Sequence, residues 1–336
     1  MQKHFYYRIM AVLIPVAGGK GGVGKSVFSL NLAVTLAQQC KKTILIDLDL
    51  GGANLHTLLG LKNNQAGIGT FITKQETDFS NLLQATGIPN LQFIAGDCLY
   101  PGVANMDFFT KCKILRNIQA LEADYIILDL GAGSTYNIVD FFITTNDGLV
   151  IVTPELTSIL NAYSFLKTTV FRLLYRSFPS KSPERQVLQN SMLQRMEGKE
   201  YSFEQILSVM SATFPESAAA ALTQLKSFRP RIVMNMGRQS EDAVLGNRLL
   251  SLSRNKLSIN PEVIGFVPYD QNIGISIARR QPLCLLNPAS PFSAAIPAVA
   301  QRIEAATTHA DMNLEEATES FEDIIKTYYE HQERDR

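Results

Sequence analysis

The chain has 336 residues, which is enough to bury a large hydrophobic core. Its hydrophobic content of 46% and charged content of 18% exclude an intrinsically disordered protein. The 31 basic side chains equal the 31 acidic ones, so the chain as a whole has no electrostatic field that would draw it to nucleic acid or anionic lipid, although a local basic patch stays open.

The cysteines are few and widely spaced, and they form no C-x-x-C pair: Cys40, Cys98, Cys112 and Cys284. This pattern is typical of small buried residues in a reducing cytosol. The apolar run that begins at Ile9 is too short to cross a bilayer, and no other stretch reaches the roughly 18 apolar residues of a spanning helix. We therefore expect a soluble, cytoplasmic protein.

Short β-rich apolar runs alternate with helical patterns along the chain. We expect strands over residues 9–16, 43–47, 91–95, 125–129, 149–153, 231–235 and 263–267, and a helix over 23–39. This alternation predicts parallel strands joined by crossover helices. The expected fold class is α/β, a mostly parallel twisted sheet with helices on both faces, and its ligands should lie beyond the carboxyl ends of the strands.

A phosphate-binding loop follows the first predicted strand. Its residues are Gly19, Lys20, Gly21, Gly22, Val23, Gly24, Lys25 and Ser26. The pattern G-x-x-x-x-G-K-S lets backbone N–H groups and the following helix N-terminus face phosphate oxygens. Lys25 should then reach the β- and γ-phosphates, and the Ser26 hydroxyl should bind Mg²⁺. Lys20 occupies an open position of the motif, so an exposed loop lysine and a functional one are equally favoured.

Acidic residues end two of the predicted strands. Asp129 closes the strand over 125–129, as expected of an aspartate that organises Mg²⁺. Asp47 and Asp49 lie two residues apart, so both carboxylates can face the loop. One of them could hold a Mg²⁺-bound water or orient the attacking water. These residues together predict a nucleotide hydrolase.

Residues 176–229 interrupt the strand–helix rhythm. We expect helices here, with a capping box at Ser202 and Gln205, Pro215 in a first helical turn, and a break at Gly198. The sequence favours equally an insertion that only adds packing and a lobe that binds a partner.

The last segment has apolar residues at helical spacing and an acidic opposite face. The apolar positions are Leu314, Ala317, Phe321, Ile324, Ile325 and Tyr328, and the acidic ones are Glu315, Glu316, Glu319, Glu322 and Asp323. Because anionic lipid repels carboxylates, the pattern favours packing on protein over a membrane. We thus expect a P-loop domain over 1–310, with the helical insertion at 176–229 inside it, and an acidic tail over 311–336.

Three segments resemble the MinD/ParA family of P-loop ATPases. Lys-Gly-Gly-Val-Gly-Lys-Ser at 20–26 resembles its deviant Walker A loop, residues 47–55 its switch I, and residues 129–133 its switch II. The resemblance implies that Lys20 reaches the phosphates of the partner subunit in an ATP-sandwich homodimer. It also implies that Asp49 orients the hydrolytic water beside Lys25, and that Ser26, Asp47 and Asp129 surround Mg²⁺.

The resemblance also implies the remaining nucleotide contacts. The loop residues and Val27 bind the phosphates, while Asn235, Pro268 and Asp270 match adenine-contacting positions. Segments 154–163, 233–236 and 265–270 are most similar to MinD-like regulators of flagellar number and placement, the FlhG/FleN type. The insertion, the N-terminal extension and the acidic tail depart from the family pattern.

The leading hypothesis is a Mg²⁺-dependent ATPase that acts as an ATP-dimerised switch for positioning or number control of a cellular structure. Its expected partners are a second copy of the chain, a protein that stimulates hydrolysis, and a membrane surface at the inner face, contacted peripherally. The alternative is a DNA-cargo partitioning ATPase, with a basic patch from Arg248, Arg254, Lys256, Arg279 and Arg280. The absence of paired cysteines disfavours a metal-cluster carrier. Only Tyr328 and Tyr329 point to a tyrosine kinase, which is weaker still. A binding module that has lost catalysis is a further alternative.

Overall fold

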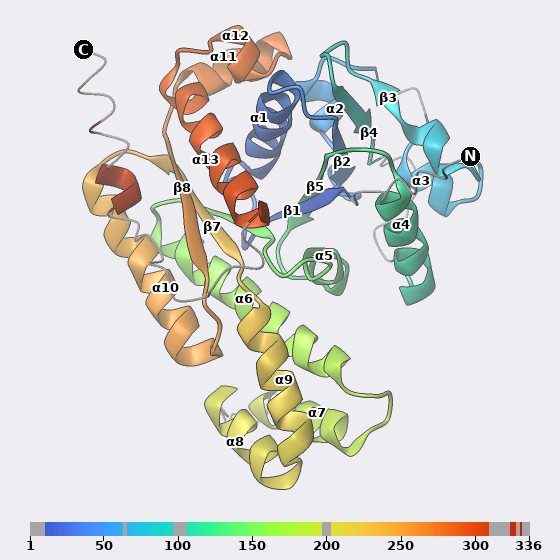
Figure 1. Ribbon diagram of the computed structural model, residues 1–336, viewed down its shortest axis with the longest axis vertical. Coiled ribbons are helices and arrows are strands. Elements are labelled where there is room, and N and C mark those ends of the chain that lie inside the picture. The colour runs from blue at the N-terminus through green and yellow to red at the C-terminus, as the bar shows by residue number, and fades with distance from the viewer. Residues whose placement is uncertain are drawn as a thin grey trace, which may run out of the picture. The chain divides into compact units, whose positions relative to one another are not determined.

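A computed structural model of the chain describes residues 11–62, 66–96, 106–196, 203–308, 323–326 and 330, with the side chains of 191–196 and 306–308 left out. Its strands are β1 (Val12–Gly18), β2 (Thr43–Leu48), β3 (Gln84–Ala85), β4 (Leu91–Ile94), β5 (Tyr125–Ala132), β6 (Leu149–Val152), β7 (Arg231–Gly237) and β8 (Glu262–Pro268). They form one sheet in the order β3-β4-β2-β5-β1-β6-β7-β8 (Figure 1). The predicted α/β fold is confirmed.

Helices separate most of these strands. They are α1 (Lys25–Gln38), α2 (Leu55–Leu58), α3 (Ile68–Ile72), η1 (Phe79–Leu82), α4 (Phe108–Ala120), α5 (Tyr136–Phe142), α6 (Leu156–Ser177), α7 (Pro183–Met196), α8 (Phe203–Thr213), α9 (Pro215–Ser227), η2 (Ser240–Asp242), α10 (Ala243–Leu257), α11 (Asn272–Arg279), α12 (Leu283–Leu286) and α13 (Pro291–Thr308). None of the described helices is both long and apolar enough to cross a membrane.

The described residues fall into two compact units. The first contains Met1–Val16, Gly24–Gly131 and Tyr269–Asn313, and the second contains Ala17–Val23, Ala132–Pro268 and Leu314–Arg336, in each case as far as they are described. The P-loop passes from the second unit to the first between Val23 and Gly24. The domain boundaries expected from the sequence stay a prediction.

In the first unit, β2 lies between β4 and β5 and is parallel to both. All of its residues are buried, as expected of an apolar strand covered on both faces. The register pairs Asp47 with Asp129 toward the carboxyl ends of β2 and β5. One more residue of β2 follows Asp47, and three more of β5 follow Asp129, so β5 continues past the end predicted at residue 129. Helix α1 packs against β2, and its side chains Phe28, Leu32 and Leu36 are completely buried. The core of this unit therefore fixes both the start of α1 and the two acidic strand ends.

In the second unit, β6, β7 and β8 run parallel, and α5 packs against α6. The ring of Phe142 on α5 meets that of Phe165 on α6 edge to face, with centroids 4.9 Å apart. Beside them Arg172 donates two hydrogen bonds to the carboxylate of Asp140, at 2.7 and 2.9 Å. An aromatic contact and an ion pair thus join the two helices.

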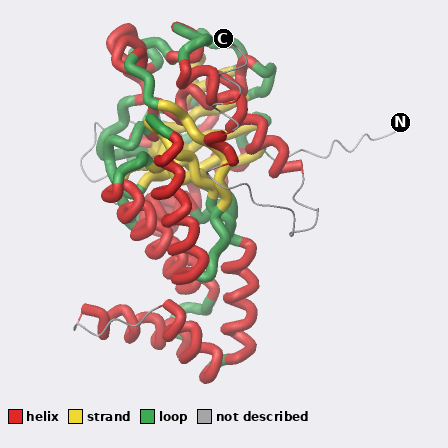
Figure 2. Tube along the Cα trace, turned by 90° about the vertical axis from the view of Figure 1, so that its left-hand side faces the viewer, coloured by secondary structure: helices red, strands yellow, loops and turns green. Residues whose placement is uncertain are grey.

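The insertion is helical, as predicted. Helices α7, α8 and α9 follow α6 (Figures 1 and 2). Helix α8 also packs against α10. Pro215 is the first residue of α9, which confirms its predicted place in a first helical turn. Phe203 of α8 packs its ring against Phe171 of α6, with centroids 5.6 Å apart. Gly198 and Ser202 lie outside the described residues.

Most of the predicted tail helix lies outside the described residues as well, including all of its glutamates from Glu315 to Glu322. Residues 323–326 are helical, and Ile324 and Ile325 are buried. These two positions belong to the apolar face predicted from the sequence.

Candidate functional site

The P-loop joins β1 to α1 through left-handed glycines. Gly22 has φ 80° and Gly24 has φ 84°, a backbone region that favours glycine. Gly24 precedes α1 directly, and its carbonyl accepts the first helical hydrogen bond, from the N–H of Phe28 at 2.9 Å. Lys25 is the first residue of α1 and is 7% exposed. The loop therefore has the helix N-terminus and the buried lysine that bind phosphate in this motif.

Gly19 is packed more tightly than Gly21 and Gly22 of the same loop. A Cβ at this position would lie 2.2 Å from the backbone carbon of Asn161 in α6, closer than any real contact. Beside it, the carbonyl of Gly18 accepts a hydrogen bond from the N–H of Gly133 at 3.4 Å. The start of the loop is thus pressed against α6, which only glycine permits.

Lys20 makes its side-chain contacts within the second unit. Its Nζ lies 2.6 Å from Oε2 of Glu155 and 3.1 Å from Oγ1 of Thr157, both at the start of α6. The Lys20 side chain is 30% exposed, and that of Glu155 is 60% exposed. The second lysine of the loop is therefore neither buried nor free, and its predicted contact with a partner subunit stays a prediction.

The carboxylate of Asp47 is 1% exposed and accepts three backbone hydrogen bonds. The N–H groups of Asp49, Asn54 and Leu55 donate to it at 3.1, 3.1 and 3.2 Å. Burial, and then the charge of Asp129, nevertheless raise the pKa of Asp47 to about 8. Asp49 is half-buried and lies just beyond the end of β2.

Asp129 is held by hydroxyl groups of α1. The Oγ of Ser29 donates to its Oδ1 at 2.9 Å, and the Ser26 hydroxyl is hydrogen-bonded to it as well. Burial raises the pKa of Asp129 to about 6, although these hydroxyl groups and the charge of Lys25 act in the opposite direction. The first unit thus gathers Lys25, Ser26, Asp47 and Asp129 at the carboxyl ends of its strands.

The predicted adenine-contacting residues lie at three later positions. Asn235 in β7 is 3% exposed, and its Nδ2 donates to the carbonyl of Val23 at 2.8 Å. Pro268 ends β8 in the second unit. Asp270, in the first unit, accepts hydrogen bonds from Asn272 at 2.8 Å and from the N–H of Phe292 at 3.3 Å. Burial alone would raise the pKa of Asp270, but these hydrogen bonds outweigh it and lower the pKa. Val27 is half-buried in the first turn of α1.

Three side chains that contact these residues were not predicted as site residues, although two of them, Glu155 and Thr157, lie in the segment 154–163 named above. Ser29 sits inside an apolar helix, and Glu155 and Thr157 lie far along the chain from Lys20. No motif spacing links residues across such separations. Only an unexplained buried polar position, Ser29 between Phe28 and Leu30, could have been noticed from the sequence.

The side chains of the first unit fit a magnesium ion carried by a nucleotide. Mg²⁺ prefers hydroxyl, carboxylate and water oxygens and is usually shared with substrate phosphates. Ser26 supplies a hydroxyl beside two buried carboxylates of raised pKa, which an added cation would stabilise in their charged form.

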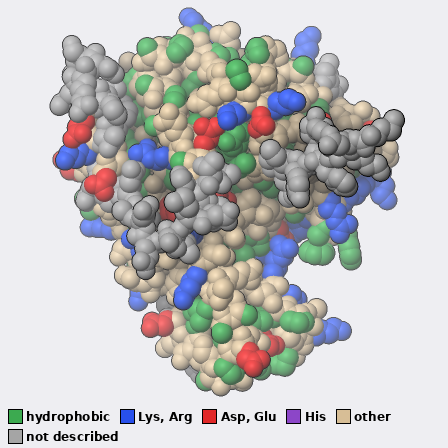
Figure 3. Space-filling view, in the orientation of Figure 1, with side chains coloured by type: hydrophobic (Ala, Val, Ile, Leu, Met, Phe, Trp, Pro, Cys, Tyr) green, Lys and Arg blue, Asp and Glu red, His purple; other side chains and the backbone are tan. Residues whose placement is uncertain are grey.

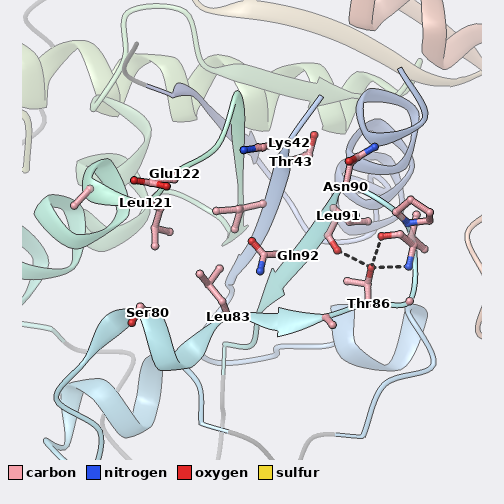
Figure 4. A pocket seen from close by; sticks show the side chains of 16 residues that line it. Lys42, Thr43, Ser80, Leu83, Thr86, Asn90, Leu91, Gln92, Leu121 and Glu122 are labelled. Atoms are coloured by element: carbon pink, nitrogen blue, oxygen red, sulfur yellow. Dashed lines mark hydrogen bonds between the residues drawn. The ribbon is translucent and has the colours of Figure 1, made fainter. Parts of the chain in front are cut away.

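A separate groove of about 800 Å³ lies at the opposite end of β2 and β4 (Figure 4). Thr43, Leu91 and Gln92 line it, together with Leu83 and Leu121. Thr86 also lines the groove, and its hydroxyl donates a hydrogen bond to the carbonyl of Leu91 at 2.8 Å. Because Thr43 begins β2 and Asp47 lies near its end, this groove is distinct from the acidic strand ends.

Comparisons with known proteins agree with this geometry. Residues 14–283 match the model of the CobQ/CobB/MinD/ParA nucleotide binding domain. The chain is 24% identical over 293 residues to the antiactivator FleN of Pseudomonas aeruginosa, covering 87% of this chain and 86% of that protein. It is 33% identical over 153 residues to the septum site-determining protein MinD of Helicobacter pylori, covering 45% of this chain and 56% of that protein.

The fold is also that of a solved structure. The septum site-determining protein MinD complexed with Mg-ADP from Pyrococcus horikoshii superposes with a TM-score of 0.59 at 15% identity, over 90% of this chain and 100% of that one. The P-loop, Asp47 and Asp129 all lie within residues 14–283, which match the family model. The chain belongs to the CobQ/CobB/MinD/ParA family of nucleotide-binding domains.

Proposed function

We propose that this chain is a magnesium-dependent ATPase that works as an ATP-dimerised switch in the positioning or number control of a cellular structure, of the flagellar or division-site type. The arrangement at the start of α1 carries this proposal. A buried Lys25 at the helix N-terminus lies in the same unit as the paired strand-end carboxylates Asp47 and Asp129. Family membership and the FleN and MinD relatives support it.

The proposed roles follow from the chemistry of each group. Backbone N–H groups of the loop and the Lys25 ammonium bind the phosphates, while Ser26, Asp47 and Asp129 hold Mg²⁺ directly or through water. The metal, when bound, neutralises charge that develops on the phosphate oxygens. Asp49 lies one residue beyond β2 with its carboxylate half-buried, where it can orient a water.

Hydrolysis is tested by two substitutions with different expected outcomes. Lys25→Ala should abolish ATP binding, because it removes the phosphate-binding ammonium. Asp49→Ala should keep ATP binding and lose turnover, because it removes only the group that orients water. Isothermal titration and phosphate release measure the two effects. ATP turnover that persists in both variants would contradict the assignment.

Dimerisation is the second part of the proposal. Lys20 is proposed to leave Glu155 and contact the phosphates of a partner subunit when ATP is bound. Lys20→Ala should then remain monomeric with ATP and Mg²⁺ in sedimentation velocity, whereas Lys226→Ala, an exposed lysine of the same unit, should dimerise like the wild type. An ATP-dependent dimer of Lys20→Ala would exclude this role.

The proposed switch also needs surfaces to act on. We propose a protein partner that stimulates hydrolysis and a peripheral contact with the inner face of a membrane in the cytoplasm. Capture with Asp49→Ala held in ATP tests both, because this variant should keep the dimer assembled. Recovery of neither a protein partner nor lipid vesicles by the ATP-bound variant would count against this part of the proposal.

The alternative is a DNA-partitioning ATPase. One observation favours it: α10 exposes Arg248, Arg254 and Lys256 on the second unit. Arg279 and Arg280, by contrast, belong to the first unit. The face in Figure 3 intermixes basic and acidic side chains, consistent with the balanced composition. DNA binding that appears only with ATP and falls steeply with salt would select this alternative.

A further inference from the structure

One buried hydroxyl of α1 has a partner in the proposed metal site. The Oγ of Ser29 donates to Oδ1 of Asp129 at 2.9 Å, and the two residues are 0% and 1% exposed. We infer that Ser29 is the positioning residue for Asp129: it holds this carboxylate in the orientation that binds Mg²⁺ with the nucleotide. This inference rests on the proposed function.

A serine at this place in α1 requires a physical reason. Inside a helix, serine is less favourable than alanine or leucine, and a buried hydroxyl without a partner is destabilising. Ser29 lies between Phe28 and Leu30, both buried. Its hydrogen bond to a charged acceptor offsets these costs, because such bonds are stronger than those between neutral groups.

Two further buried polar side chains of α1, Asn31 and Thr35, serve packing. Asn31 accepts a hydrogen bond from the N–H of Cys284 at 2.9 Å, and the Thr35 hydroxyl lies 3.8 Å from the Cys284 sulfur. Both contacts join α1 to α12. Ser29 instead faces the strand end of β5, so its contact is the one that a change in the metal site would affect.

The two hydroxyl groups on Asp129 have different tasks. Ser26 belongs to the P-loop motif and is the hydroxyl expected to bind Mg²⁺. Binding to Mg²⁺ would use a lone pair of the Ser26 oxygen, so this hydroxyl is tied to the metal as well as to Asp129. Ser29, one helical turn further along α1, is not part of the motif and can stay on Oδ1. It therefore fixes one carboxylate oxygen and leaves the other to the metal or its water.

The test is the effect of Mg²⁺ on ADP affinity, measured by calorimetry with Mg²⁺ and with EDTA. In the wild type, Mg²⁺ should tighten ADP binding. In Ser29→Ala the affinity in EDTA should be unchanged, and the tightening by Mg²⁺ should fall roughly tenfold to a hundredfold, the usual effect of losing a group that orients a metal ligand. Thr35→Val, which removes another buried hydroxyl of α1, should keep the full tightening.

A double-mutant cycle shows whether Ser29 acts through Asp129. In the Asp129→Asn background, Ser29→Ala should change the Mg²⁺ effect no further. Equal loss of ADP affinity in EDTA and in Mg²⁺, or an unreduced Mg²⁺ effect, would overturn the inference while leaving the proposed function intact. A wild-type protein whose ADP affinity does not respond to Mg²⁺ would overturn both.

Discussion

At the scale of single residues, the paired carboxylates of Asp47 and Asp129 dominate the electrostatics of the first unit. They lie opposite each other in the register of β2 and β5, and each is 1% exposed. Burial opposes the charged form of both, which is why the pKa of each is raised. Such a pair binds protons or a cation more readily than ordinary surface aspartates do.

The raised pKa of Asp129 predicts how stability depends on pH. Because its folded-state pKa of about 6 exceeds the ordinary 3.8, its stabilising effect is full below pH 4 and is lost as the pH rises through 6. Without metal or nucleotide, Asp129→Asn should therefore be more stable than the wild type at pH 8, by at most about 3 kcal/mol. The difference should shrink toward pH 5. Urea unfolding across this range measures it, and a variant less stable than the wild type at pH 8 would contradict it.

The close approach of Gly19 to α6 predicts unequal tolerance within the P-loop. A Cβ at Gly19 would meet the backbone of Asn161 at 2.2 Å, whereas at Gly21 the nearest atom, the Cβ of Ala132, lies 4.0 Å away. Gly19→Ala should cost about 1–3 kcal/mol or more, since backbone must shift. Gly21→Ala should fold almost normally. Thermal unfolding of the two variants compares them directly, and equal melting temperatures would count against the packing described.

Asn235 has two candidate roles that differ in their dependence on the base. The resemblance implies an adenine contact, whereas the structure places its amide on the carbonyl of Val23 in the P-loop. Because that hydrogen bond acts on the loop, we expect Asn235→Ala to weaken ATP and GTP binding alike, by roughly tenfold. Competition titrations with both nucleotides measure this. Weakening of ATP binding alone would favour the adenine contact.

At the scale of elements, the pairing of α5 with α6 depends on a buried ion pair. Asp140 of α5 is 4% exposed and receives two hydrogen bonds from Arg172 of α6. Arg176 lies further away, with 3.7 Å between Nη1 and Oδ1, and its side chain is 42% exposed. Since α5 begins a few residues after the glycines of the predicted switch II, this pair anchors the helix that follows that segment.

Removing the two arginines should have very different costs. Arg172→Ala takes the two short charged hydrogen bonds from a buried carboxylate and should destabilise the protein by about 3–5 kcal/mol. Arg176→Ala removes only a long, exposed contact and should cost less than about 1 kcal/mol. Adding Asp140→Asn to Arg172→Ala should recover part of the loss, because it removes the buried charge that has lost its two shortest hydrogen bonds. Chemical denaturation tests all three, and similar costs for both arginines would disprove the ranking.

At the scale of the whole molecule, the helical insertion belongs to the hydrophobic core of the second unit. Phe203 is 3% exposed and packs on Phe171 of α6. Phe203→Ala should therefore cost about 3–5 kcal/mol, whereas Val209→Ala on the exposed side of α8, at 45% exposure, should change stability by less than about 0.5 kcal/mol. Denaturation curves give both values. A small cost for Phe203→Ala would indicate that the insertion folds apart from α6.

Much of this architecture follows from local patterns. The predicted strands appear within a few residues of their observed ends because buried parallel strands are short continuous apolar runs. The glycine loop and the acidic strand ends could be located for the same reason, since each is adjacent to such a run. β3 could not be predicted, because Gln84 and Ala85 are too few to show any periodicity.

The contacts that connect distant segments could not be predicted from one sequence. Lys20 meets Glu155, and Asn235 meets Val23, only because the sheet brings their elements together. Ser29 belongs to no sequence motif, and its acceptor lies 100 residues further along the chain. Spacing rules act within one element, whereas these contacts depend on the order of strands in the sheet.

The hydrogen bond between Asn235 and Val23 has a kinetic consequence. It holds the P-loop on β7 without the help of a ligand. Part of the loss of conformational entropy of the loop therefore occurs when the chain folds. A ligand that meets an ordered loop has less conformational entropy to remove and can associate in a single step. Stopped-flow traces of ADP binding, which does not require the proposed dimer, should then be single-exponential with rates linear in concentration.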